Sequence, residues 1–103
     1  MIDVPIHPGI AATRDEMVAL RRDIHANPEL GFQEFRTADL VAERLARWGY
    51  EVHRGLGGTG VVATLTVGSG TRRLALRADM DALPMTETSG LPWASGQAGR
   101  MHA

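Results

Sequence analysis

Leu74-Ala75-Leu76-Arg77-Ala78-Asp79-Met80-Asp81-Ala82-Leu83-Pro84 is the stretch that decides how the rest of the chain is interpreted. It begins as a run that is apolar apart from one arginine, which is typical of a buried β-strand, and Pro84 enforces a turn at its end. Asp79 and Asp81 project to the same side of an extended segment, so their carboxylates can converge on one cation, or on one cation and one histidine. The commoner outcome for aspartates before a proline is a plain turn, and spacing alone leaves both interpretations open.

The residues before this strand predict its partner. Residues 61–67 are a β-branched run, residues 68–70 contain two glycines and favour a turn, and residues 72–78 return as the next strand. We therefore expect a hairpin over residues 61–78. A shorter alternating segment at residues 50–54 predicts one further strand.

Between these strands, residues 55–60 match G-x-G-x-x-G, the spacing of dinucleotide-binding loops. In such a site the glycine loop opens a helix whose N-terminus holds the pyrophosphate. Here a strand-like run follows instead, so nucleotide binding is not expected.

Two amphipathic helices are predicted upstream of the strands. Residues 1–12 contain two prolines and a glycine without periodicity and are expected to form an extended lead-in. Thr13 and Glu16 match a capping box that starts the first helix, and Asn27-Pro28 ends it because the residue before a proline is pushed out of the helical region. The apolar stripe of this helix is Met17, Leu20 and Ile24.

The second predicted helix follows a turn at residues 29–34. Its apolar positions recur at helical spacing: Ala38, Val41, Leu45 and Trp48. Trp48 is therefore expected in the core, and Gly49 is placed as the left-handed residue that ends the helix. The predicted fold class is α/β, with two N-terminal helices followed by a β-hairpin or the start of a mixed sheet.

Composition narrows the function classes. The 103 residues, 44% hydrophobic and 22% charged, are typical of one soluble globular domain at most. A net charge of −1 without a basic run argues against nucleic acid as a partner, and the absence of cysteine excludes disulfides and thiolate ligands within the chain. No apolar run has the length of a membrane span, and residues 1–9 lack the pattern of a secretory signal. A cytoplasmic protein without a membrane partner is expected.

Five segments, in this order along the chain, carry a resemblance: residues 21–34, 77–84, Glu87, 89–95 and 99–103. Together they resemble peptidase family M20, metal-dependent amidohydrolases, in the branch of hippurate hydrolases, N-acyl-amino-acid amidohydrolases (aminoacylases) and auxin-conjugate hydrolases. The resemblance implies that residues 13–103 are the N-terminal part of a zinc-peptidase-like catalytic domain. It places further catalytic and dimerisation regions downstream.

In that family two divalent ions, Mn, Zn, Co or Ni, activate a water that attacks the amide carbonyl of an N-acyl amino acid or similar conjugate. The resemblance makes Asp81 and Asp79 the candidate catalytic residues: Asp81 sits beside the metals and orients a ligand, and Asp79 stands where other branches have a metal-binding histidine. His102 matches a motif position that is not a ligand, and His25 is either a helix cap or surface group, or a residue behind the active site. No metal ligand is expected within this chain, because the family's ligands follow the position of Ala103.

The chain by itself is therefore expected to bind no metal and to hydrolyse nothing, whereas the parent protein is expected to be a homo-oligomer that acts on small N-acyl amino acids. An unpaired apolar strand edge is expected to make the isolated chain self-associate. The alternative is a small non-enzymatic α/β module that binds a partner chain through the edge of its sheet.

Overall fold

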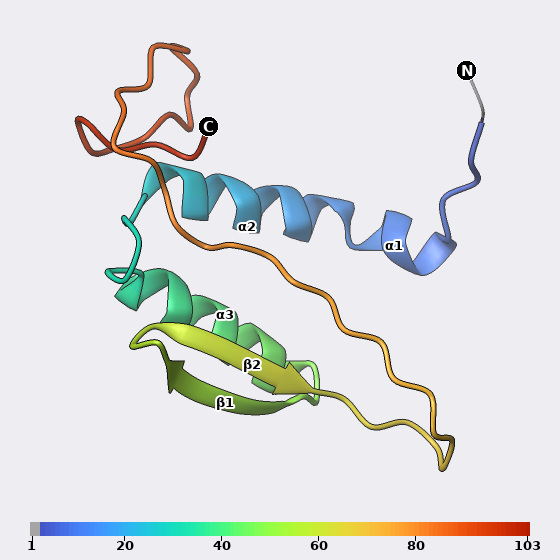
Figure 1. Cartoon of the computed structure of the whole chain (residues 1–103). Helices are drawn as coiled ribbons and strands as arrows, with labels where there is room; N and C mark the ends of the chain where they lie inside the picture. Colours follow the sequence, from blue (N-terminus) through green and yellow to red (C-terminus); the bar gives the residue numbers. More distant parts are fainter. Residues whose placement is uncertain (1–2) are drawn as a thin grey trace.

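The computed structural model describes residues 3–103 (Figure 1). Within this range the chain forms three helices and one antiparallel sheet: α1 (Pro8–Ala12), α2 (Arg14–Ala26), α3 (Phe35–Arg47), β1 (Glu51–Leu56) and β2 (Gly60–Thr64). The predicted α/β class, in which helices precede a β-hairpin, is confirmed.

The first helix corrects the predicted lead-in. Residues 1–12 were expected to be extended, but α1 forms at their end, and residues 1 and 2 lie outside the described part of the chain. Pro8 occupies the first helical position, where its fixed φ is favourable, and His7 Nδ1 accepts a hydrogen bond from the Gly9 amide at 3.0 Å. Of the two prolines in this stretch, one therefore starts a helix.

Thr13 ends α1 and does not cap α2. Its hydroxyl donates to the Ile10 carbonyl at 2.9 Å, and its backbone is close to helical, with φ −95° and ψ 4°. A capping box needs an extended residue at this position, so the predicted box is wrong, and Glu16 instead pairs with Arg44 of α3 at 2.7 Å. The predicted end of α2 at Asn27 is confirmed.

The third helix lies on the β1–β2 hairpin (Figure 1). Its buried residues are small, which brings the helix close to the sheet: Thr37, Ala38 and Ala42. Gly49, at φ +89°, ends the helix as predicted. The Gly49 amide donates to Ala46 at 3.1 Å and the Tyr50 amide donates to Leu45 at 3.0 Å, the two bonds of a Schellman motif.

Trp48 is 46% exposed, so its predicted place in the core is wrong. The buried stripe of α3 consists of its small residues, whereas Val41, Leu45 and Trp48 line an apolar groove. The facing side of that groove is formed by Leu20 and Ile24 of α2. Helical spacing located the apolar face correctly, but α2 and α3 do not close over it.

The glycine-rich residues 55–60 connect the two strands of the hairpin. Gly55, at φ +86°, forms a bulge in β1. A Cβ at Gly60 would lie 2.4 Å from the Leu56 carbonyl oxygen, so this tight connection requires glycine there. The connection continues into β2, and the helix that a dinucleotide site requires does not follow.

Residues 65–81 form no helix or strand (Figure 1), so the predicted hairpin over residues 61–78 is wrong. β2 pairs with β1 instead, and Leu74 and Leu76, in the predicted buried strand, are 87% and 91% exposed. The local sequence identifies an extended segment correctly. A strand also needs hydrogen-bonded neighbours, and the described residues supply none for this one.

The whole chain is expanded for its length. Its radius of gyration is 16.2 Å, against about 13 Å for a compact domain of 100 residues. The buried apolar side chains of the described range are three alanines, Ala38, Ala42 and Ala82, and one proline, Pro28. This core is too small to account for a stable domain by burial alone.

Candidate functional site

Asp81 leaves the extended segment beside the turn that precedes α3. A Cβ on Gly31 would lie 3.6 Å from Asp81 Oδ2. The next residue, Ala82, is buried and donates its amide to the Glu29 carbonyl at 2.8 Å, within a parallel bridge to Leu30. The backbone on the C-terminal side of Asp81 is thus fixed to this turn.

Asp79 has a different neighbour. Its Oδ1 accepts from Arg77 Nη2 at 3.1 Å, in a pair whose side chains are both exposed. Among residues 3–103, no three His, Cys, Asp or Glu side chains lie close enough together to hold a metal ion. The described residues therefore do not form a metal centre, and the catalytic roles of Asp79 and Asp81 stay predictions.

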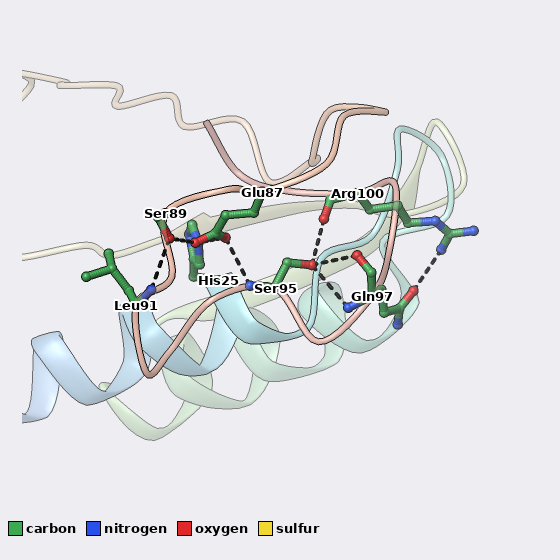
Figure 2. A network of polar contacts seen from close by, with 7 residues as sticks. All are labelled: His25, Glu87, Ser89, Leu91, Ser95, Gln97 and Arg100. Carbon is green, nitrogen blue, oxygen red and sulfur yellow. Dashed lines mark hydrogen bonds and ion pairs between the residues drawn. The ribbon is translucent and has the colours of Figure 1, made fainter.

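The buried carboxylate of Glu87 is the centre of a polar network (Figure 2). Its side chain is 4% exposed and accepts hydrogen bonds from the Ser89 hydroxyl, from the Ser95 amide at 2.9 Å and from His25 Nε2 at 2.6 Å. The bonds from Ser89 and Ser95, in that order, lower the pKa of Glu87 to about 2. An ionised carboxylate only accepts, so His25 is the donor in their pair.

His25 was open to two interpretations, a helix cap or surface group and a residue behind the active site. It lies in the last turn of α2, yet its Nε2 binds Glu87 and its ring lies 6.3 Å from that of His102. His25 is thus bound to a distant segment of the chain and is not a free surface group, and its place behind the active site stays a prediction. His25 connects α2 to the segment that carries the last predicted motifs.

Two contacts fix the loop after Glu87 to the C-terminal half of α2. The Gly96 amide donates to the Ala26 carbonyl at 2.9 Å, which satisfies one of the free carbonyls at the helix end. The Arg22 guanidinium lies 3.6 Å from the centre of a Trp93 ring, within the range of a cation–π interaction. Figure 1 shows the result, in which the C-terminal loop sits against the end of α2 that is remote from α1.

The chain then returns towards Asp81. Ser95 Oγ donates to the Arg100 carbonyl at 2.6 Å (Figure 2), and Leu83 and Met101 exchange two backbone hydrogen bonds of 2.9 and 3.1 Å. This antiparallel bridge brings His102 back beside the segment that contains Asp81.

His102 is the third titratable side chain of this region. Its Nε2 atom is buried and has no hydrogen-bond partner among the described residues. Burial lowers the pKa of His102, the nearby charge of His25 lowers it further, and the carboxylate of Asp81 opposes both effects. His102 therefore lies within electrostatic reach of both His25 and Asp81, although the three residues come from separate segments.

Glu29, which precedes the turn beside Asp81, binds the first turn of α3. Glu29 accepts from the Arg36 amide at 3.0 Å and from the amide and hydroxyl of Thr37, both at 2.6 Å. Burial would raise the pKa of Glu29, but the bonds from Thr37 and Arg36 outweigh it and lower that pKa. A charged carboxylate thus satisfies the free amides of the first turn of α3.

A second carboxylate, Glu34, holds the middle of the turn. It is 7% exposed, and it accepts from the Phe32 amide at 3.0 Å and from the Thr59 hydroxyl in the hairpin connection. Phe32 has φ +65°, and within residues 3–103 it is the one residue other than glycine with a positive φ. The turn is thereby locked to the sheet on one side and to α3 on the other.

Sequence reasoning did not find the roles of Glu87, Glu29 and Glu34. Glu87 was noted through the resemblance, but its partner His25 is 62 positions away, and spacing rules act over a few residues. The turn offered one local signal, since two glutamates precede a helix, and acidic side chains favour a helix N-terminus.

No family model matches the sequence. A hippurate hydrolase of Campylobacter jejuni is 48% identical over 96 residues, which cover 93% of this chain and 25% of the relative. Thermostable carboxypeptidase 2 of Saccharolobus solfataricus is 47% identical over 90 residues, which cover 86% of this chain and 23% of the relative.

A similar fold occurs in a crystal structure from Bacillus subtilis, that of a dinuclear metal-binding peptidase from the M20 family. The two structures superpose with a TM-score of 0.82 at 36% sequence identity, over 89% of this chain and 26% of the other. The chain therefore spans about a quarter of the length of the proteins that it resembles.

Proposed function

Because this chain belongs to the M20 peptidase family, we propose that it forms part of the catalytic domain of a metal-dependent amidohydrolase. The observation that carries the proposal is the likeness in both sequence and backbone, over nearly all of the chain, to a dinuclear metal-binding peptidase. The surroundings of Asp81 agree with it, since a fixed turn stands beside its carboxylate and His102, which lies near His25, is within its electrostatic reach.

The proposed substrate of the parent protein is an N-acyl amino acid or a similar conjugate, cleaved at its amide bond. The support is the hippurate hydrolase relative, whose sequence is 48% identical to this chain. The carboxypeptidase relative, at 47% identity, favours a peptide as the second candidate. N-acyl amino acids and peptides are both cleaved at an amide bond. The two candidate substrate classes can therefore be compared in the same assay of amino-acid release.

The proposed cofactors are two divalent ions, from Mn, Zn, Co and Ni. The described residues contain no group of three potential ligands, and we propose that the ligands lie in other parts of the parent protein. Asp81 is the residue of this chain that we place beside the metals, to orient a ligand. Asp79 is engaged by Arg77, which makes it the weaker of the two candidates.

The first experiment compares the full-length parent with the 103-residue chain on N-benzoyl and N-acetyl amino acids and on dipeptides. The parent is expected to release the amino acid, to lose activity after chelation and to regain it with one of the four metals. The chain alone is expected to be inactive in every condition. Metal-dependent cleavage by the chain alone would contradict the proposal, and so would a metal-loaded parent that cleaves none of the substrates.

The exposed apolar segment supports one further proposal about partners. Leu74 and Leu76 stand open on an unpaired extended segment, so the isolated chain is expected to self-associate and not to remain a monomer. A homo-oligomeric parent and a cytoplasmic location stay predictions from the sequence. Among residues 3–103, no helix has the length and hydrophobicity needed to cross a membrane.

A further inference from the structure

The turn at residues 30–33 places an aromatic residue where glycine is favoured. The Gln33 amide donates to the Leu30 carbonyl at 2.9 Å, which closes the turn, and Phe32 at its third position has φ +65°. Turns with a positive φ at this position prefer glycine or asparagine, because a Cβ there clashes with the backbone. The glycine of this turn stands one residue earlier, at position 31.

The unfavourable conformation is enforced from several sides. The buried Glu34 carboxylate accepts from the Phe32 amide at 3.0 Å and is itself bound by Thr59. On the preceding side, the Ala82 amide donates to Glu29 at 2.8 Å. Strain that is maintained by so many contacts is a feature of functional sites.

The ring of Phe32 gains little from packing in return, because the residue is 79% exposed. Its neighbour Gly31 stands next to the carboxylate of Asp81, with 3.6 Å between a Cβ on Gly31 and Oδ2. Phe32 therefore directly follows the residue that stands beside Asp81, where we place the reaction, and its side chain is largely uncovered by the rest of this chain. Exposed aromatic side chains beside polar catalytic groups are typical of sites that bind apolar parts of ligands.

We propose that Phe32 is a specificity-determining residue that contacts the apolar acyl group of the substrate. This inference rests on the proposed function.

The test uses the full-length, metal-loaded parent and the variant Phe32→Asn. Asparagine tolerates a positive φ and keeps the amide that binds Glu34, so it removes the ring and leaves the turn intact. The matched control is Phe35→Asn. Phe35 is also exposed, at 65%, but it lies in the first turn of α3 and lines a different groove, beside Ala38 and Arg54.

For Phe32→Asn, kcat/KM on an N-benzoyl amino acid is expected to fall roughly 10-fold or more, mainly through KM. On the N-acetyl derivative of the same amino acid, the fall is expected to stay within about 3-fold, because an acetyl group has little surface to contact the ring. The Tm and metal content of the variant are expected to equal or exceed those of the wild type, since a strained aromatic has been removed. Phe35→Asn is expected to leave the ratio of the two substrates unchanged.

An equal loss on both substrates, or a lower Tm with unchanged selectivity, would show that Phe32 is structural and would overturn the inference. A change of selectivity in Phe35→Asn as large as that in Phe32→Asn would overturn it as well. If the wild-type parent cleaves neither substrate, the proposed function itself fails, and the assignment of Phe32 fails with it.

Discussion

Glu87 ties two separate parts of this chain together. Its carboxylate joins the last turn of α2, through His25, to the loop that contains Ser89 and Ser95. Three donors surround one buried acceptor, so removal of the acceptor charge leaves all three with a weaker partner. The effect on stability should therefore depend on the ionisation of this one group.

We expect Glu87→Gln to lower the Tm of the full-length parent near neutral pH. The pKa of Glu87 in the folded protein is about 2, below its ordinary value of 4.5. Its stabilising contribution is thus fully present above pH 4.5 and is lost as the pH falls towards 2. Differential scanning fluorimetry between roughly pH 7 and pH 3.5 should show that the Tm difference between wild type and variant narrows as the pH falls.

The matched control for this prediction is Glu43→Gln. Glu43 pairs with Arg47 on the exposed face of α3, so its replacement should leave Tm nearly unchanged at every pH. A Tm difference for Glu87→Gln that stays constant down to the acid end would mean that the carboxylate charge is not what holds the network.

At the scale of elements, the hairpin depends on one glycine. A Cβ at Gly60 would lie 2.4 Å from the Leu56 carbonyl oxygen, a separation at which the backbone must shift. Gly60→Ala in the parent is expected to cost about 1–3 kcal/mol, the range typical of overpacking, measured by urea unfolding. Gly70→Ala is the control, because no atom lies within 4 Å of its Cβ position, and it should be neutral or slightly stabilising. Equal effects of the two substitutions would contradict this account of the turn.

The elements that sequence analysis predicted well are those that depend on near neighbours. The extents of α2 and α3, the glycine that ends α3 and the absence of a helix after residues 55–60 all follow from spacing over a few positions. The hairpin over residues 61–78 was wrong because strand pairing is chosen by distant segments. Thr13 was misread because its role depended on α1, a helix of five residues that has no periodicity to detect.

In the candidate site, too, the sequence predicted local features and missed contacts between distant segments. The motifs pointed to the segments that carry Asp81, His25 and His102, and the structure brings these three residues together. They did not show that Asp79 pairs with Arg77, nor that Glu87 binds His25. Those contacts depend on the path of the chain between the motifs, and no spacing rule specifies that path.

For the whole molecule, the tendency to associate depends on how little apolar surface the chain removes from water. Three alanines and one proline are the buried apolar side chains of residues 3–103, and the radius of gyration of 16.2 Å exceeds the value for a compact domain of this length. The apolar residues of the extended segment find no cover within the chain. Such a surface favours association between copies.

The isolated 103-residue chain is expected to self-associate in a concentration-dependent way, as judged by size-exclusion chromatography with light scattering. Leu76→Lys should reduce this association, because Leu76 is 91% exposed in the centre of the unpaired segment. Ile10→Lys is the control, since Ile10 is also exposed, at 66%, but belongs to α1 and not to that segment. A chain that stays monomeric at high concentration would contradict the prediction, and so would equal effects of the two substitutions.

The separation of His25 and Glu87 in the sequence also delays the formation of their hydrogen bond during synthesis. The two residues are 62 positions apart, and at about 5–20 residues per second a ribosome needs roughly 3–12 s to add the second after the first. In that interval α3 and the hairpin, whose contacts are short in sequence, can form on the nascent chain. The end of α2 stays uncovered until the Glu87 loop emerges, so during this interval it is open to chaperones and proteases.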